Sequence, residues 1–183
     1  MRYDRLSFDI DGNEIIAVKD SSNNTYYNNA GKTRRLGAEA SVDYIIKEGL
    51  HVGGSGSLFD YSYVDYQIAD GDYSGKKQRF IPDYQYSVFG GYKKGGFSSR
   101  IESVTYGSYY MDDANTEKYN GYTFVTNIML AYKYNHNKLQ LNVNNLFDKR
   151  YATEANKVSG FTTTYYYTPA TPLFAMLTYS YEF

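Results

Sequence analysis

The sequence predicts an all-β protein, namely an antiparallel up-and-down transmembrane β-barrel of about eight strands. Three observations support this. Apolar residues recur at every second position, and no sustained i, i+3, i+4 pattern of a helix is found. Most alternating segments reach the roughly 9–11 residues that a tilted strand needs to cross the hydrocarbon layer. Short and long connections alternate along the chain, as in a membrane meander with short periplasmic turns and longer extracellular loops.

The first four predicted strands lie at residues 5–18, 33–46, 50–65 and 83–92. Each has apolar residues in one phase and polar residues in the other. Gly12 disturbs the phase of the first segment, as a β-bulge does. The contrast is clearest in the second, whose apolar phase is Leu36, Ala38, Ala40, Val42, Tyr44 and Ile46.

The last four predicted strands complete the meander. Residues 97–106 have the weakest alternation, and residues 121–133 a strong one. The seventh strand opens the stretch LNVNNLFDKRY at 141–151, with Leu139 already in phase. The eighth is LFAMLTYSYEF at 173–183, which ends the chain with aromatic residues on one face.

The connections between these strands fall into two classes. Three are tight polar turns, at 47–49, 93–96 and 135–138. Four are long and rich in Asn, Asp, Ser, Thr, Gly and Tyr, at 19–32, 66–82, 107–120 and 146–172. One end of the sheet therefore carries turns and the other carries large loops.

The composition excludes several function classes. The 19 Lys and Arg nearly balance the 20 Asp and Glu, so no global field attracts nucleic acid. No stretch of about 18 apolar residues exists for a spanning helix. A barrel strand needs only every second residue apolar, so a hydrophilic chain is compatible with lipid.

The alternation also assigns the two faces of the sheet. If the apolar phase meets lipid, the opposite phase lines the lumen, because a charge at mid-depth in lipid costs several kcal/mol. The predicted lumen-facing residues are Glu39, Asp43, Arg100, Glu102, Asn142 and Asn144. Tyrosines near the strand ends, such as Tyr84, Tyr92 and Tyr132, are expected to form aromatic girdles at the membrane interfaces.

Several motifs resemble one family. NNLFDKRY at 144–151, followed by a long loop and a terminal strand ending in YSYEF, resembles the C-terminal signature of TonB-dependent outer-membrane receptors. Residues 27–44, 79–92 and 109–134 resemble further segments of that family in the same order, especially in ferric-siderophore and ferric-citrate receptors. The resemblance covers nearly the whole chain.

The resemblance implies a location and partners. Members of this family lie in the bacterial outer membrane, hold a plug domain inside a barrel of 22 strands, and engage the energy-coupling protein TonB through an N-terminal segment. Only about eight strands are found here, and neither plug nor coupling segment. Residues 1–183 are therefore expected to be the C-terminal portion of the barrel, with the remaining strands, the plug, lipid and an iron chelate as partners.

Ligand recognition is expected in the loops. Aromatic and arginine side chains suit an anionic, partly aromatic iron chelate such as the resemblance implies. The candidates are Arg34, Arg35, Tyr109, Tyr110, Tyr165 and Tyr166. The terminal residues Tyr179, Tyr181 and Phe183 resemble the signal by which outer-membrane barrels are recognised for assembly.

No catalytic, cofactor or metal site is predicted. The two histidines, His51 and His136, lie far apart in the sequence, and Cys is absent. The acidic cluster from Asp112 to Glu117 lacks EF-hand spacing and is expected to be a solvated loop. Two alternatives to a receptor remain open. One is a self-contained eight-stranded outer-membrane barrel acting as an anchor or adhesin, and the other is a soluble β-barrel that binds a ligand.

Overall fold

The computed structural model describes residues 2–3, 12–19, 25–68, 71–160 and 162–183, and describes side chains from residue 31 onward. All regular structure in this part of the chain is β, and none of it is a helix that could cross a membrane. The strands are β1 (Arg2–Tyr3), β2 (Gly12–Lys19), β3 (Thr25–Lys47), β4 (Leu50–Ile68), β5 (Gly71–Asp72), β6 (Tyr84–Lys94), β7 (Phe97–Tyr106), β8 (Tyr109–Tyr110), β9 (Lys118–Tyr119), β10 (Tyr122–Tyr134), β11 (Asn137–Asn144), β12 (Ala152–Val158), β13 (Thr164–Pro169) and β14 (Phe174–Tyr181).

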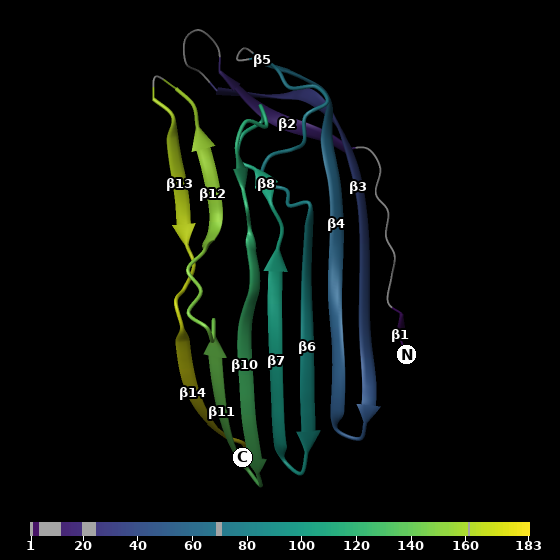
Figure 1. The fold of residues 1–183 in the computed structure, drawn as a ribbon, viewed down its shortest axis with the longest axis vertical. Helices are drawn as coiled ribbons and strands as arrows, with labels where there is room; N and C mark the ends of the chain where they lie inside the picture. The colour runs from purple at the N-terminus through teal and green to yellow at the C-terminus, as the bar shows by residue number, and fades with distance from the viewer. Residues whose placement is uncertain (1, 4–11, 20–24, 69–70, 161) are drawn as a thin grey trace.

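Seven long strands form an antiparallel meander in the order β3-β4-β6-β7-β10-β11-β14. Every hydrogen-bonded neighbour in this path is also the next long strand along the chain, which confirms the predicted up-and-down topology. Tight turns join β3 to β4, β6 to β7 and β10 to β11 at the lower end of Figure 1. The upper end carries β5, β8 and the β12–β13 hairpin, which belong to the long connections.

The hairpin of β3 and β4 is longer than a membrane crossing requires. At about 3.3 Å per residue, the 23 residues of β3 span about 75 Å, against a hydrocarbon core of about 30 Å. Residues 25–32, expected in a loop, belong to β3. Residues 25–32, TYYNNAGK, show no apolar alternation, so no strand was predicted there.

The N-terminal segments pair with the free side of β3. Tyr3 lies opposite Val42, and Gly12 lies opposite Thr33. Tyr3 and Gly12 are nine positions apart in the sequence, and so are their partners Thr33 and Val42 in β3. Both β1 and β2 therefore keep the register of one antiparallel partner of β3. The predicted strand at 5–18 agrees with β2 over residues 12–18, and residues 5–11 lie outside the described part of the chain.

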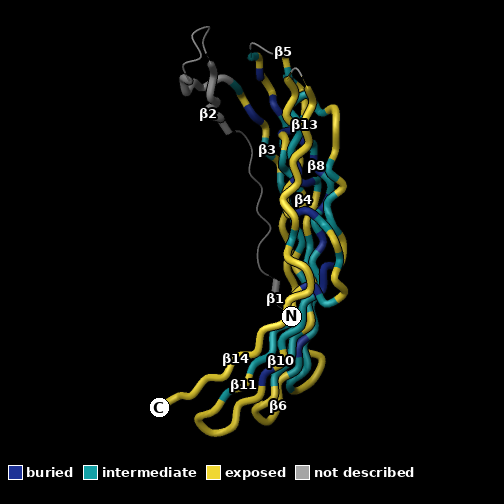
Figure 2. The backbone as a smooth tube through the Cα atoms, turned by 90° about the vertical axis from the view of Figure 1, so that its left-hand side faces the viewer, coloured by how far each residue is buried: buried dark blue, intermediate teal, exposed yellow. Residues whose placement is uncertain are grey.

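The sheet is open. Within the described residues, β14 pairs with β11 alone and leaves its other edge without a neighbouring strand. Figure 2 shows the sheet from the side, as one tall layer that bends near the turn end. An antiparallel layer with two edges is what a part of a wide barrel is expected to form.

Among the residues whose side chains are described, the long strands enclose no thick core. Few strand side chains are buried, because each face of the single layer is left uncovered in this structure (Figure 2). The most compact packing lies among the upper connections, around Tyr109, Met111 and Ala155. Two short strand pairs there, β8–β9 and β12–β13, were predicted as loop. They are too short and too uniformly polar or tyrosine-rich to show alternation.

Candidate functional site

The register brings the predicted lumen residues to one face. Asp43 lies opposite Gly53, which lies opposite Phe89, which lies opposite Glu102. Arg100 lies opposite Met129, which lies opposite Asn142, in the adjoining row. Side chains two or four residues apart in a strand lie on the same face. Glu39 therefore shares the face of Asp43, and Asn144 shares the face of Asn142. All six residues therefore share one face of the sheet.

The opposite face carries exposed apolar side chains. Leu130 lies opposite Leu141, which lies opposite Leu177, so that one row crosses three strands. The exposed apolar and aromatic members of this face include Leu36, Val42, Tyr44, Val52, Leu58, Tyr84, Val88, Phe97, Ile101, Leu130, Tyr132, Leu139, Leu177, Tyr179 and Tyr181. Exposed apolar area of this extent needs a covering phase, and lipid supplies one.

A connected cluster occupies the polar face near the turn end. The Arg100 guanidinium lies 3.7 Å from the centre of the Phe89 ring and pairs with Glu102 at 3.3 Å. The ring of His51 contacts the Phe89 ring edge to face, with 5.8 Å between the two ring centres. Nδ1 of His51 lies 3.6 Å from a carboxylate oxygen of Asp43. This cluster links β3, β4, β6 and β7 side by side.

Two glycines make room for that cluster. A Cβ at Gly53 would lie 2.6 Å from Cζ of Phe89, and one at Gly91 would lie 1.9 Å from Nε2 of His51. Both rings therefore approach the backbone of a neighbouring strand closely. Glycine in a strand interior commonly marks such a close approach.

The upper connections pack against one another through Tyr109. Its side chain is 3% exposed and contacts Phe80, Tyr106 and Tyr119. Its hydroxyl donates to the carbonyl of Ala155 at 3.0 Å and accepts from the amide of the same residue at 2.6 Å. Burial raises the pKa of this phenol. Tyr109 thus joins β8 to the β12–β13 hairpin.

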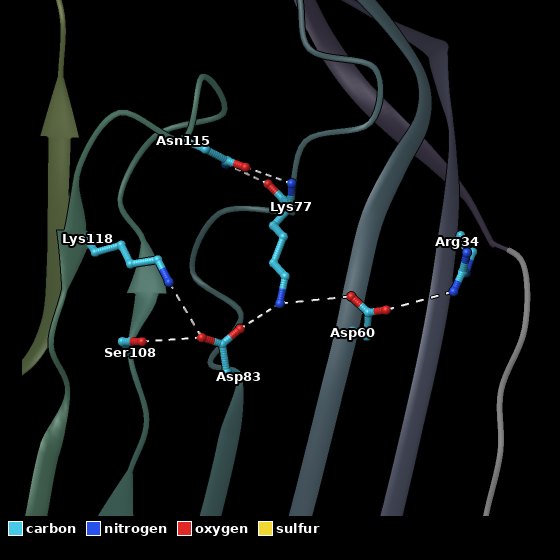
Figure 3. Close-up of polar contacts among 7 residues, drawn as sticks. All are labelled: Arg34, Asp60, Lys77, Asp83, Ser108, Asn115 and Lys118. Atoms are coloured by element: carbon cyan, nitrogen blue, oxygen red, sulfur yellow. Dashed lines mark hydrogen bonds and ion pairs between the residues drawn. The ribbon is translucent and has the colours of Figure 1, made fainter.

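Asn115 ties the 111–117 turn to the segment before β6. Its side-chain oxygen accepts from the amide of Lys77 at 2.7 Å, and its side-chain nitrogen donates to the carbonyl of Lys77 at 2.8 Å, as Figure 3 shows. Neighbouring Asp113 accepts from the hydroxyl of Tyr63 at 2.8 Å and pairs with Arg79 at 3.4 Å. The side-chain amide of Asn115 thus binds both the N–H and the carbonyl of Lys77, as the backbone of a neighbouring strand would.

Asp112 ties the same turn to the β12–β13 hairpin. It accepts from the amide and the hydroxyl of Thr116 and pairs with Lys157 at 3.1 Å, with both charged side chains 13% exposed. Burial acts to raise the pKa of Asp112, but the hydrogen bonds from Thr116 and Lys157 outweigh it, so the pKa is held below its ordinary value. We call residues 111–117 the loop clasp.

Two carboxylates of the loop clasp, those of Asp112 and Asp113, are engaged in protein contacts. The carboxylates of Asp112 and Asp113 bind Thr116, Lys157, Tyr63 and Arg79 as above. No group of three or more candidate metal ligands occurs among the residues that the structure describes. The acidic stretch expected to be a solvated loop is therefore a cross-link between three connections. The Asp-Asp-x-Asn motif was visible in the sequence, but its partners in the other connections lie 34–50 residues away.

The predicted ligand-binding residues do not form one group. Arg34 and Arg35 are neighbours in β3 and so lie on opposite faces: Arg34 pairs with Asp60, whereas Arg35 lies over the ring of Tyr61. Tyr109 is buried as described. Tyr110 lies beneath the ammonium of Lys118 at 4.6 Å. Tyr165 and Tyr166 are 45% and 57% exposed, on opposite faces of the β12–β13 hairpin.

The terminal aromatic residues lie at the turn end of the sheet. Tyr179 donates to the side chain of Asn137 at 2.6 Å, and Tyr181 contacts both His136 and Phe183 through its ring. Beside them Glu182 accepts from Lys133 at 2.6 Å. These contacts attach the end of the chain to the β10–β11 turn and leave the aromatic faces exposed.

A family model described as "TonB dependent receptor-like, beta-barrel" matches residues 7–146, which is most of the chain. The chain belongs to the TonB-dependent receptors. This family consists of transporters and receptors rather than enzymes, and its members are β-barrels of the bacterial outer membrane.

Solved TonB-dependent receptors share the fold. The siderophore receptor PiuA from Acinetobacter baumannii matches with a TM-score of 0.71 and 23% identity, over 92% of this chain and 24% of that one. The ferric yersiniabactin uptake receptor FyuA from Yersinia pestis matches with a TM-score of 0.69 and 20% identity, over 86% of this chain and 25% of that one. The ferric citrate transporter FecA in its unliganded form matches with a TM-score of 0.66 and 20% identity, over 90% of this chain and 26% of that one. The chain thus spans about a quarter of the length of these structures.

Proposed function

We propose that residues 1–183 form the C-terminal portion of the β-barrel of a receptor for energy-coupled uptake of an iron chelate across the outer membrane. The observation that carries the proposal is the open sheet. Its long strands have one apolar and one polar face, yet β14 has no second neighbour in the described residues. An unpaired edge is very costly in lipid, so further strands complete the barrel.

The partners follow from this arrangement. The remaining barrel strands pair with β14 and with the outer edge of β1 and β2. A plug fills the wide lumen and meets the polar face that carries Asp43, Arg100 and Glu102. Coupling to TonB is a property of the rest of the receptor, because nothing in the described residues resembles a flexible coupling segment. Lipid covers the apolar face.

An iron chelate suits the upper connections. Siderophore-like chelates are anionic and often aromatic, and they are bound by cationic and aromatic side chains. Arg35 lies on the polar face, whereas Tyr110, Tyr165 and Tyr166 lie at the loop end with exposed or partly exposed rings. The ligands that the three similar receptors are named for agree with this class: a siderophore, ferric yersiniabactin and ferric citrate.

Refolding tests the proposal. The chain is refolded in detergent alone and together with a polypeptide that carries a plug and the remaining strands. We expect a protease-resistant, monodisperse species only from the mixture. A compact, protease-resistant monomer from the chain alone would instead show a self-contained barrel, and good solubility in buffer with no entry into micelles would show a soluble binder.

Ligand binding is tested in the assembled receptor. Single substitutions Tyr165→Ala and Tyr166→Ala change similarly exposed rings on opposite faces of one hairpin, so each serves as the control of the other. We expect one of them, together with Arg35→Ala, to weaken binding of a ferric siderophore, measured by quenching of the labelled receptor. Unchanged affinity in all three variants would remove these residues from the ligand site.

A further inference from the structure

The apolar face ends at a defined height on the loop side. On β4 the outward residues run from Leu50 at the turn through Val52 to Leu58, and the next outward residue is Asp60. Ten residues at about 3.3 Å each, tilted by about 40°, cover about 25 Å along the membrane normal. That is the height of the apolar band of an outer-membrane barrel. Asp60 therefore lies at the level of the lipid headgroups of the outer leaflet.

A ladder of alternating charges crosses the sheet at this level, as Figure 3 shows. Arg34 of β3 lies 3.8 Å from Asp60 of β4, and the ammonium of Lys77 lies 3.9 Å from the same carboxylate. Lys77 also donates to Asp83 at 2.7 Å, and Lys118 of β9 lies 3.7 Å from Asp83. We call these five residues the charge ladder.

The charge ladder is open to a neighbouring molecule. Its cations Arg34, Lys77 and Lys118 are 56%, 43% and 41% exposed. Three of its four ion pairs are 3.7 Å or longer, and exposed pairs of this kind contribute little to stability. Three cations stand against two carboxylates, so the ladder carries an excess positive charge beside the end of the apolar band.

We propose that the charge ladder binds the phosphate groups of anionic lipids in the outer leaflet, with Arg34, Lys77 and Lys118 as the binding residues. Arg34 presents a planar fork that matches a phosphate, and the two lysines present point charges. Asp60 and Asp83 hold the three cations apart along the membrane plane. Leu36, Leu58 and Tyr84 are exposed on the face that carries Arg34 and Asp60, and they contact the acyl chains of the same lipids.

Lipid retention tests this proposal in the assembled receptor. The receptor is reconstituted in vesicles of phosphatidylcholine and phosphatidylglycerol, extracted in mild detergent, and its bound lipid is quantified by mass spectrometry. The variant Arg34→Gln/Lys77→Gln/Lys118→Gln is expected to retain about fivefold less phosphatidylglycerol than the wild type, which corresponds to about 1 kcal/mol. Retention of phosphatidylcholine is expected to be unchanged.

A second variant separates lipid binding from a structural role. Asp60→Asn/Asp83→Asn breaks the same ion pairs but keeps the three cations, so phosphatidylglycerol retention is expected to equal or exceed that of the wild type. Equal losses in the two variants, or no loss in the cation variant, would overturn the proposal. Protease resistance of the barrel and uptake of the ferric chelate are measured in parallel, so a failure of the proposed function is recognised independently.

Discussion

Leu141 and Asn142 are consecutive residues of β11 whose side chains lie on opposite faces of the sheet. Leu141 lies between Leu130 and Leu177, and Asn142 lies between Met129 and Met176. Both are central in their strand and have a neighbour on each side. They therefore form a matched pair for measuring which face meets lipid.

Leu141→Arg is expected to impair membrane assembly far more than Asn142→Arg. An arginine at mid-depth on the lipid face costs about 2–4 kcal/mol, whereas one on the lumen face meets water or a plug. The measurement is the fraction of receptor that becomes heat-modifiable and protease-resistant in the outer membrane. Similar losses in both variants would refute the assignment of the faces.

Gly121 precedes β10 in the left-handed region, with φ of 72°, and closely approaches another strand. A Cβ there would lie 2.0 Å from the carbonyl oxygen of Tyr106 and 2.5 Å from that of Gly107. Gly75 has a similar φ of 78°, but a Cβ there would contact nothing within 4 Å. The two positions share the backbone cost and differ only in the steric one.

Gly121→Ala is expected to destabilise the barrel by several kcal/mol, because backbone atoms have to move in addition to the ~1 kcal/mol conformational cost. Gly75→Ala is expected to cost only about 1 kcal/mol. Urea unfolding of the assembled receptor in detergent measures both. A Gly121 variant as stable as the Gly75 variant would show that β7 and the start of β10 are not in such close contact.

At the scale of elements, the loop clasp joins three connections into one body. It contacts the segment before β6 through Asn115 and the β12–β13 hairpin through Asp112. Loops of a receptor that recognise a small ligand need a defined arrangement, and loops without mutual contacts lack one. The clasp supplies that arrangement through the side chains of Asp112, Asp113 and Asn115.

Asn115→Ala is expected to loosen the segment before β6, because it removes both hydrogen bonds to the backbone of Lys77. Two such bonds contribute about 1 kcal/mol each, so tryptic cleavage after Lys76, Lys77 or Arg79 should accelerate at least about tenfold. The control is Asn120→Ala, which changes an exposed amide of the same connection. Equal cleavage rates in the two variants would contradict the clasp.

The contact between Asp112 and Lys157 is expected to respond to acid. The folded-state pKa of Asp112 lies below its ordinary value of 3.8, so this contact stabilises the loops above that pH and ceases to do so as the pH falls through the lower folded-state value. Hydrogen exchange of residues 152–169, corrected for its intrinsic pH dependence, should therefore rise below about pH 4. Asp112→Asn should remove this rise, and a rise that persists in the variant would assign it to other carboxylates.

At the scale of the whole molecule, the free edge of β14 distinguishes a part of a barrel from a closed one. In the chain alone, amides of residues 174–181 that point away from β11 have no partner strand and are expected to exchange rapidly. In the assembled receptor they are expected to be protected. Strand β7 has neighbours on both sides and serves as the internal control. Equal protection of β14 in both samples would indicate closure of the chain on itself.

Much of the architecture could be predicted from the sequence, because the alternation of apolar and polar residues along each long strand can be recognised from the sequence alone. The range 97–106 matches β7, and the ends of 121–133 differ from those of β10 by one residue. The first residues of β3 and the pairs β8–β9 and β12–β13 show no such alternation, so they were predicted as loop. The six lumen candidates shared a face in the sequence and share it in the structure.

The sequence by itself determined the fold class, the strand order, the two faces and the family, since each depends on local periodicity or on motifs read along the chain. The tertiary structure decided what the loops do. It buried Tyr109 against Ala155 and turned an acidic stretch into a cross-link through Asn115 and Lys157. Those outcomes depend on partners tens of residues away, which no local pattern specifies.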